Sequence, residues 1–224
     1  MKWQRPDDRQ ANPIIDNLDP KVRLALETMA EKWAADQICL CENLECDKIH
    51  SQDGEEYDIY VEQRRRLACE VIRHCESPPE QLLRLAFEDR QAATSAWYEI
   101  TPQFEVKTAR GKYRLDFVVG YWPMDEVEIA VGVECDGHEW HDKTPAQAAR
   151  DKARDRALAG FGFPVLRFAA IEVFNDANKC ASEVFEVLQF MWRQTREAGA
   201  IFSALTRYKI LSHRPEPDSN HPIC

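Results

Sequence analysis

Residues 129–136 read IAVGVECD, an apolar run that ends in two acidic residues. Side chains along a strand point alternately to its two faces. One face would hold only side chains suited to a core: Ile129, Val131, Val133 and Cys135. Glu134 and Asp136 would lie on the opposite face, beside small residues that let a helix or a ligand approach. Two carboxylates at the end of a buried strand repel each other and lose hydration, so a cation or a hydrogen-bond donor is expected beside them.

Two further strands precede this segment. WYEITPQFEV at residues 97–106 and YRLDFVVGYW at residues 113–122 are rich in β-branched and aromatic residues, and an Arg110-Gly111 turn separates them. The three runs follow one another with short connections, which predicts a three-stranded meander. A fourth short run, PVLRF at residues 164–168, indicates a buried strand.

Capping signals place the helices of this region. Ser77-Pro78-Pro79-Glu80 and Thr144-Pro145-Ala146-Gln147 each combine a capping box with proline at the first helical position. They predict one helix over about 78–91 and another from 145 to Gly160 or Gly162. Apolar residues at helical spacing predict a long closing helix over 177–198.

The N-terminal part is also helical. Asp19-Pro20 begins a helix over about 20–37, and a second helix covers about 57–75, with a cysteine-bearing stretch between them. The whole order predicts an α/β fold: helix, three-stranded meander, helix, strand and helix on one core, preceded by a helical accessory region. We divide the chain accordingly into an accessory region at 1–76, an α/β domain at 77–200 and a tail at 201–224.

The composition is that of a globular protein. A chain of 224 residues with 44% hydrophobic content can bury one full core. No stretch approaches the ~18 apolar residues of a membrane span, and the N-terminus lacks the apolar core of a signal peptide, so we expect a cytoplasmic protein with reduced thiols and no membrane partner. The net charge of −10 cannot attract a polyanion through the overall field, so binding of nucleic acid must be local or use bound cations.

The acidic residues of two neighbouring strands suggest a metal site. Asp116 interrupts the apolar run YRLDFVV and would lie near Glu134 and Asp136. Three carboxylates form a hard oxygen site, which suits Mg²⁺ or Mn²⁺, and such an ion polarises a phosphodiester and activates water. The alternative is structural: Asp116 pairs with Arg114 or Arg167, and the other two residues cap a loop.

Three separated elements together resemble the very-short-patch-repair-endonuclease-like branch of the PD-(D/E)XK nucleases. They are Asp116, the segment ECDGHEWH at 134–141, and the helix ARDKARDRALAGFGF followed by the strand PVLRF. The resemblance covers about residues 77–190 and implies a restriction-endonuclease-like core. It also implies that Asp116 and Glu134 are metal ligands, that the Cys135 carbonyl is a further ligand, and that Gln103 on the first strand assists.

One position departs from the family pattern. The family places a lysine two residues after the glutamate, whereas this chain has Asp136 there. Lys143, just before the following helix, is a candidate for the missing positive charge. His138 and His141 are candidates for acid and base near neutral pH. If none of them reaches the site, the domain would bind nucleic acid without cutting it.

The helix from residue 145 carries four cations in two rows, Arg150/Arg154 and Lys152/Arg156, beside a stripe of alanines. Such rows, with Lys143 and Gln103, could hold phosphates on either side of the scissile one. DNA is the expected partner, and RNA is not excluded. The alternative is a solvated amphipathic helix, with Asp151 and Asp155 facing outward.

Two features of the N-terminal half have a functional and a structural interpretation. The cysteine-rich segment offers four soft ligands within twelve residues, a candidate Zn²⁺ site, although ordinary core thiols are the more frequent outcome: Cys39, Cys41, Cys46 and His50. Arg64-Arg65-Arg66 is either a solvated helix face or a second phosphate contact.

The sequence as a whole predicts a divalent-metal-dependent endodeoxyribonuclease. Two alternatives remain open. One is a catalytically inactive nucleic-acid-binding module of the same fold. The other is an interaction factor whose acidic N-terminal helices dock a protein partner.

Overall fold

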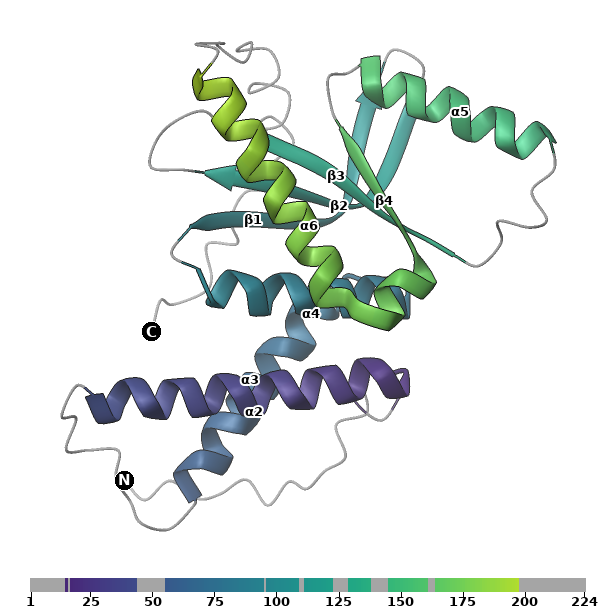
Figure 1. Cartoon of the computed structure of the whole chain (residues 1–224). Coiled ribbons are helices and arrows are strands. Elements are labelled where there is room, and N and C mark those ends of the chain that lie inside the picture. Colours follow the sequence, from purple (N-terminus) through teal and green to yellow (C-terminus); the bar gives the residue numbers. More distant parts are fainter. Residues whose placement is uncertain are drawn as a thin grey trace.

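The computed structural model describes residues 15, 17–43, 55–94, 96–108, 111–122, 129–137, 145–160 and 164–197. In this part of the chain, five helices and one four-stranded sheet form a mixed α/β structure, compatible with a restriction-endonuclease-like fold (Figure 1). In chain order the elements are α2 (Pro20–Asn43), α3 (Glu55–Ile72), α4 (Pro78–Ala92), β1 (Trp97–Thr108), β2 (Gly111–Trp122), β3 (Ile129–Asp136), α5 (Pro145–Gly160), β4 (Val165–Ala169) and α6 (Ala170–Glu197).

The sheet has the strand order β1-β2-β3-β4. The first three strands are antiparallel, so the predicted meander is confirmed, whereas β4 runs parallel to β3 and follows the α5 crossover. The prediction of a buried fourth strand is only partly right. Phe168 is buried, but the three residues before it are partly exposed, because β4 lies at the edge of the sheet.

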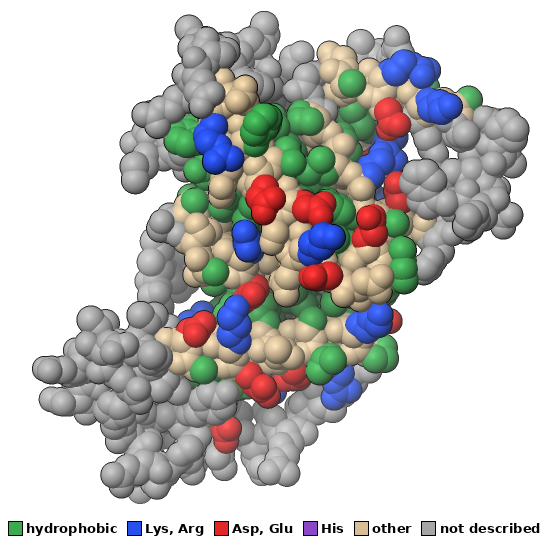
Figure 2. Space-filling view, in the orientation of Figure 1, with side chains coloured by type: hydrophobic (Ala, Val, Ile, Leu, Met, Phe, Trp, Pro, Cys, Tyr) green, Lys and Arg blue, Asp and Glu red, His purple; other side chains and the backbone are tan. Residues whose placement is uncertain are grey.

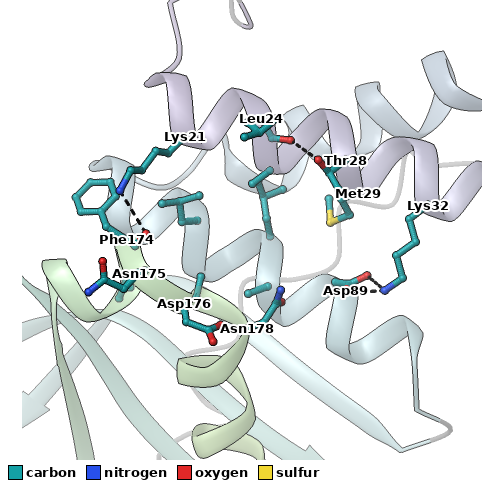
Figure 3. Close-up of a pocket in the computed structure, with 16 residues that line it drawn as sticks. Lys21, Leu24, Thr28, Met29, Lys32, Asp89, Phe174, Asn175, Asp176 and Asn178 are labelled. Atoms are coloured by element: carbon teal, nitrogen blue, oxygen red, sulfur yellow. Dashed lines mark hydrogen bonds and ion pairs between the residues drawn. The ribbon is translucent and has the colours of Figure 1, made fainter.

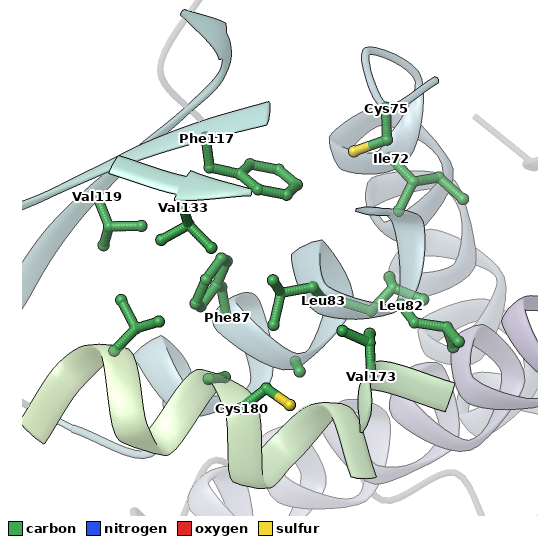
Figure 4. Close-up of a cluster of buried hydrophobic side chains, with 14 of the residues drawn as sticks. Ile72, Cys75, Leu82, Leu83, Phe87, Phe117, Val119, Val133, Val173 and Cys180 are labelled. Atoms are coloured by element: carbon green, nitrogen blue, oxygen red, sulfur yellow. The ribbon is translucent and has the colours of Figure 1, made fainter. Parts of the chain in front are cut away.

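One hydrophobic core joins the sheet to most of the helices. Phe87 of α4 meets Phe117 of β2 edge-on at 5.7 Å between ring centroids (Figure 4). Phe87 also stacks on Phe185 of α6 at 5.8 Å. Leu26 of α2 and Ile72 of α3 belong to the same cluster. Since α4 contacts α2, α3, α6 and β1, it connects the N-terminal helices to the sheet.

A second, smaller cluster lies on the opposite face of the sheet, where α5 approaches. It comprises Val106, Leu115, Val118, Ala130 and Leu158. Only the C-terminal part of α5 reaches it, since Ala157 and Leu158 are buried while Ala146 and Ala149 are exposed. Ala146 and Ala149 of the alanine stripe therefore do not pack on the sheet, and the first half of the helix projects beyond it (Figure 1).

The β1–β2 hairpin changes face halfway along its length. Leu115 and Phe117 would share one face of a regular strand. Instead, Phe117 packs in the main core and Leu115 in the second cluster. The change coincides with Gln103, the one non-glycine residue with positive φ (+50°) among those described. The strand register places Gln103 opposite Asp116, between the pairs Pro102–Phe117 and Phe104–Leu115.

The helix boundaries follow local capping, with two corrections. Ser77 and Glu80 form the predicted capping box of α4, with 2.6 Å between the Ser77 hydroxyl and the carboxylate. Asp176 departs from helical geometry and accepts a hydrogen bond from the Lys179 amide, so the long part of α6 begins where predicted, after a short extra segment. By contrast, α2 extends beyond the predicted residue 37 into the cysteine-bearing stretch, and α3 ends at Ile72 rather than at 75.

A cavity of about 580 Å³ lies between α2, α4 and the start of α6 (Figure 3). At one end the Lys21 ammonium donates to the Phe174 carbonyl and lies 5.0 Å from the centre of its ring. At the other end Lys32 pairs with Asp89 at 2.6 Å. These contacts tie α2 to the rest of the fold. None of the described helices is both long and apolar enough to cross a membrane.

Candidate active site

Asp116 of β2 lies beside the end of β3. Its Oδ2 accepts a hydrogen bond of 2.7 Å from the backbone amide of Cys135. This bond crosses from one strand to the next and fixes the carboxylate beside Glu134. The interpretation that Asp116 pairs with Arg114 or Arg167 is wrong. Arg114 pairs with Glu76 at 2.6 Å, and Arg167 forms ion pairs with Glu134 and Asp136.

Glu134 is the most deeply buried acidic residue of the site, with 3% of its surface exposed. Its Oε1 accepts a hydrogen bond from Arg154 of α5, and its Oε2 lies 2.9 Å from Nη2 of Arg167 of β4. Both oxygens therefore face guanidinium groups. The same Arg154 nitrogen also donates to the Arg114 carbonyl at 2.7 Å, which joins α5 to β2.

Arg167 links two elements around this site. It lies 3.5 Å from Asp136 and 2.7 Å from Asp155 of α5. Asp155 is exposed, as expected, and its ion pair with Arg167 links α5 to β4. Glu134 and Asp136 do not simply cap a loop, since both face Arg167, which stands opposite Glu134 in the β3–β4 register.

Burial and neighbouring charges set the electrostatics of the acidic cluster, by which we mean Asp116, Glu134 and Asp136. Burial raises the pKa of Asp116 to about 6, while the Cys135 amide opposes the shift and the Glu80 carboxylate adds to it. Burial also raises the pKa of Glu134, although Arg154 and Arg167 act in the opposite direction. The Asp136 carboxylate adds to the rise in the pKa of both Asp116 and Glu134.

The acidic cluster has the oxygen ligands that a hard cation prefers, but its side chains are not arranged around a common point. Carboxylate oxygens are the ligands that Mg²⁺ and Mn²⁺ prefer, and Glu134 Oε2 and Asp136 Oδ2 are buried with no well-directed hydrogen bond from the described residues, although both form ion pairs with Arg167. However, no three acidic, cysteine or histidine side chains in the described part of the chain are grouped closely enough to hold an ion. Arg154 would have to leave Glu134 for that carboxylate to become a ligand.

Two residues of the site escaped the sequence analysis. Arg167 was considered only as a partner of Asp116, yet a lone cation inside an apolar strand was a usable signal. Glu80 was interpreted only as part of a capping box. The residue is only 6% exposed, and its carboxylate accepts a 2.7 Å hydrogen bond from Gln103 and adds to the rise in the pKa of Asp116.

The expected nucleic-acid contacts are dispersed in the structure. Arg150, Lys152 and Arg156 are exposed on α5, where basic side chains gather at the upper right of Figure 2. Arg154 instead lies in the acidic cluster, and Gln103 is bonded to Glu80.

The alternative basic surface on α3 is largely neutralised. Arg65 bonds Glu27 and Glu62, and Arg66 bonds Glu62. Because these guanidinium groups already face carboxylates, α3 is a weaker candidate for phosphate contacts than α5.

Several predicted site residues lie outside the described part of the chain: His138, His141, Lys143, Cys46 and His50. Cys39 and Cys41 lie within α2, but their side chains are also outside it. Cys135 packs against the main core, as predicted for its thiol.

Comparison with known proteins adds one finding. No curated protein and no solved structure matches the chain. Residues 90–188 match the family model REase_MTES_1575, a restriction-endonuclease-like family. The matched segment is somewhat less than half of the chain and extends from the end of α4 into α6. It contains the whole acidic cluster and both arginines that face it, and the match supports a restriction-endonuclease-like PD-(D/E)XK domain in this part of the protein.

Proposed function

We propose that the protein is a divalent-metal-dependent endonuclease that hydrolyses DNA phosphodiester bonds. The observation that carries the proposal is the orientation of Asp116 beside Glu134 by the Cys135 amide, within the segment that matches a restriction-endonuclease-like family. Asp116 and Glu134 would hold Mg²⁺ or Mn²⁺, with Asp136 and the Cys135 carbonyl as further ligands. The ion would polarise the phosphodiester and lower the pKa of a bound water.

Arg154 and Arg167 offer the positive charge that the family pattern assigns to a lysine. Both guanidinium groups lie at Glu134, one from the helix and one from the edge strand. Guanidinium groups bind carboxylates and phosphates in the same fork geometry. We therefore place Arg154 at the scissile phosphate and leave Arg167 as the fixed neighbour of Glu134 and Asp136. Lys143, His138 and His141 remain candidates for handling water and protons.

The exposed cations of α5 would hold the DNA backbone on either side of this point. Arg150, Lys152 and Arg156 project from a helix whose first half stands clear of the sheet. A chain of net charge −10 gains little from its overall field, so such local contacts and bound cations must supply the attraction.

The pairing of Glu134 with two arginines favours a second function, binding of nucleic acid without cleavage. Both oxygens of Glu134 face arginines, a pairing that by itself neutralises the carboxylate. If that pairing persists in solution, the domain binds nucleic acid without cutting it.

A plasmid-nicking assay separates the two functions. We expect nicking with Mg²⁺ or Mn²⁺, none with EDTA, and none for Asp116→Asn or Glu134→Gln. Glu186→Gln, the same carboxylate-to-amide change on an exposed face of α6, is the matched control and should nick normally. DNA binding without nicking by the wild-type protein in either metal would establish the second function instead.

A further inference from the structure

Backbone strain and an acidic residue of the site coincide at one point of the hairpin. Gln103 has a φ of +50°, a conformation that favours glycine or asparagine over other residues. The register places it opposite Asp116. Residues held in such conformations persist only where their surroundings impose them, and they cluster at functional sites.

A residue of α4 holds the side chain of Gln103. Its Nε2 donates a 2.7 Å hydrogen bond to Oε2 of Glu80. Glu80 is itself fixed, because the Glu76 amide donates to the same oxygen at 3.0 Å and the Ser77 hydroxyl donates to the other at 2.6 Å. A buried carboxylate with three donors thus sets both the position and the orientation of the amide.

The change of face in the hairpin does not require glutamine. Glycine would adopt the positive φ without strain, and the backbone alone turns the strand. What glutamine adds is an amide oxygen. With Nε2 directed to Glu80, Oε1 is buried and has no hydrogen-bond partner among the described residues. A buried carbonyl without a donor is unfavourable, so we expect its partner to be a water or a substrate group at the site.

We propose that Gln103 is a positioning residue of the nuclease site: Glu80 anchors its amide nitrogen, and the amide oxygen accepts a hydrogen bond from the attacking water beside Asp116. The inference rests on the proposed nuclease function. The amide takes no proton; it restricts the rotation of the water so that an oxygen lone pair faces the phosphorus. The positive φ, the bond to Glu80 and the amide oxygen without a partner among the described residues thus coincide at this one residue.

The first test compares Gln103→Ala with Gln103→Gly. Both lack the amide, and we expect each to lower kcat by ~100-fold, the effect of losing a well-placed orienting group, with KM for DNA changed less than about twofold. They differ only in a Cβ at positive φ, so the glycine variant should melt about 2–6 °C higher than the alanine variant. Should the alanine variant not fold, the glycine variant still carries the kinetic test.

The second test asks whether Glu80 acts through Gln103. Glu80→Gln keeps the capping box, because glutamine serves at that position, but it weakens the anchor of the amide. We expect it to lower kcat, and the double variant with Gln103→Ala to be no slower than Gln103→Ala alone. Glu186→Gln, the same change at an exposed acid of α6, is the control and should have wild-type kcat.

The outcomes separate this inference from the proposed function. Wild-type protein that does not cleave, or cleavage by Asp116→Asn, removes the nuclease assignment and the inference with it. Wild-type kcat in Gln103→Gly, with Asp116→Asn inactive, overturns the inference alone, because the backbone turn would then be the whole role of the residue. Additive losses in the double variant would remove Glu80 from the arrangement.

Discussion

Asp116→Asn should stabilise the metal-free protein at neutral pH while abolishing cleavage. Burial raises the pKa of Asp116 from 3.8 to about 6 in the folded protein. A folded pKa above the unfolded one means that the charged form disfavours folding. The cost is fully present above pH 6, declines as the pH falls toward 3.8, and is absent below it. Asparagine is neutral at every pH and carries no such cost.

The size of the effect follows from the shift. A difference of about two pKa units corresponds to about 3 kcal/mol. This difference already includes the hydrogen bond from the Cys135 amide, which favours the charged form, and asparagine can accept the same bond as the protonated carboxyl does. The gain is therefore about 3 kcal/mol near pH 7.5, which raises Tm by about 6–12 °C for a chain of this size.

Thermal unfolding followed by circular dichroism in EDTA, from pH 4 to pH 8, tests this directly. The gap between Asp116→Asn and wild type should be largest above pH 6 and should close near pH 4, where the wild-type carboxyl is protonated and both side chains are neutral. Glu186→Gln should show no such trend. Added Mg²⁺ should raise the Tm of wild type and leave that of Asp116→Asn unchanged, since only the former binds the ion. A gap that is constant with pH, or a less stable variant at pH 7.5, would contradict the reasoning.

Further expectations concern the arginines and the thiols. Arg167→Met should lower the free energy of unfolding by about 2–3 kcal/mol, because it leaves the Glu134 carboxylate with one cation. Adding Glu134→Gln to this variant should recover most of the loss. Equal melting temperatures for wild type and Arg167→Met would refute the expectation. Arg150→Ala should weaken DNA binding in Ca²⁺ equally across sequences and reduce the salt slope by about one unit, whereas Arg193→Ala on α6 should change neither. An unchanged slope would remove α5 from the interface. Elemental analysis should find no zinc in protein purified without chelator, since core thiols are the expected role of the cysteine-rich segment, and one equivalent would reverse that expectation.

Elements governed by local signals were predictable from the sequence. The period-two pattern of IAVGVECD placed Val131 in the main core and Ala130 on the opposite face, as the structure has them. The capping box at Ser77 fixed the start of α4, and the helix expected from residue 177 begins after Asp176. In each case the deciding interactions lie within four residues along the chain.

Contacts that depend on register between distant segments were not predictable. Arg167 faces Glu134 only because β4 adds to β3 in parallel with this particular pairing. The exposed first half of α5 follows from the direction in which the crossover leaves the sheet, which its alanine pattern does not encode. Gln103 carries no turn signal, since glycine or asparagine would be the usual residue at positive φ. Its side chain is held by Glu80, which is 23 residues away.

The single core that joins the N-terminal helices to the sheet limits how this protein can be recombined with others. Recombination at a point in the gene upstream of α4 would transfer the sheet without α2 and α3. The surface of α4 that these two helices contact would then be exposed to solvent. Leu82 and Leu85, now buried there, would then favour aggregation over folding. Gene shuffling can therefore move this nuclease-like segment into another protein only together with α2 and α3, or with compensating polar substitutions along α4.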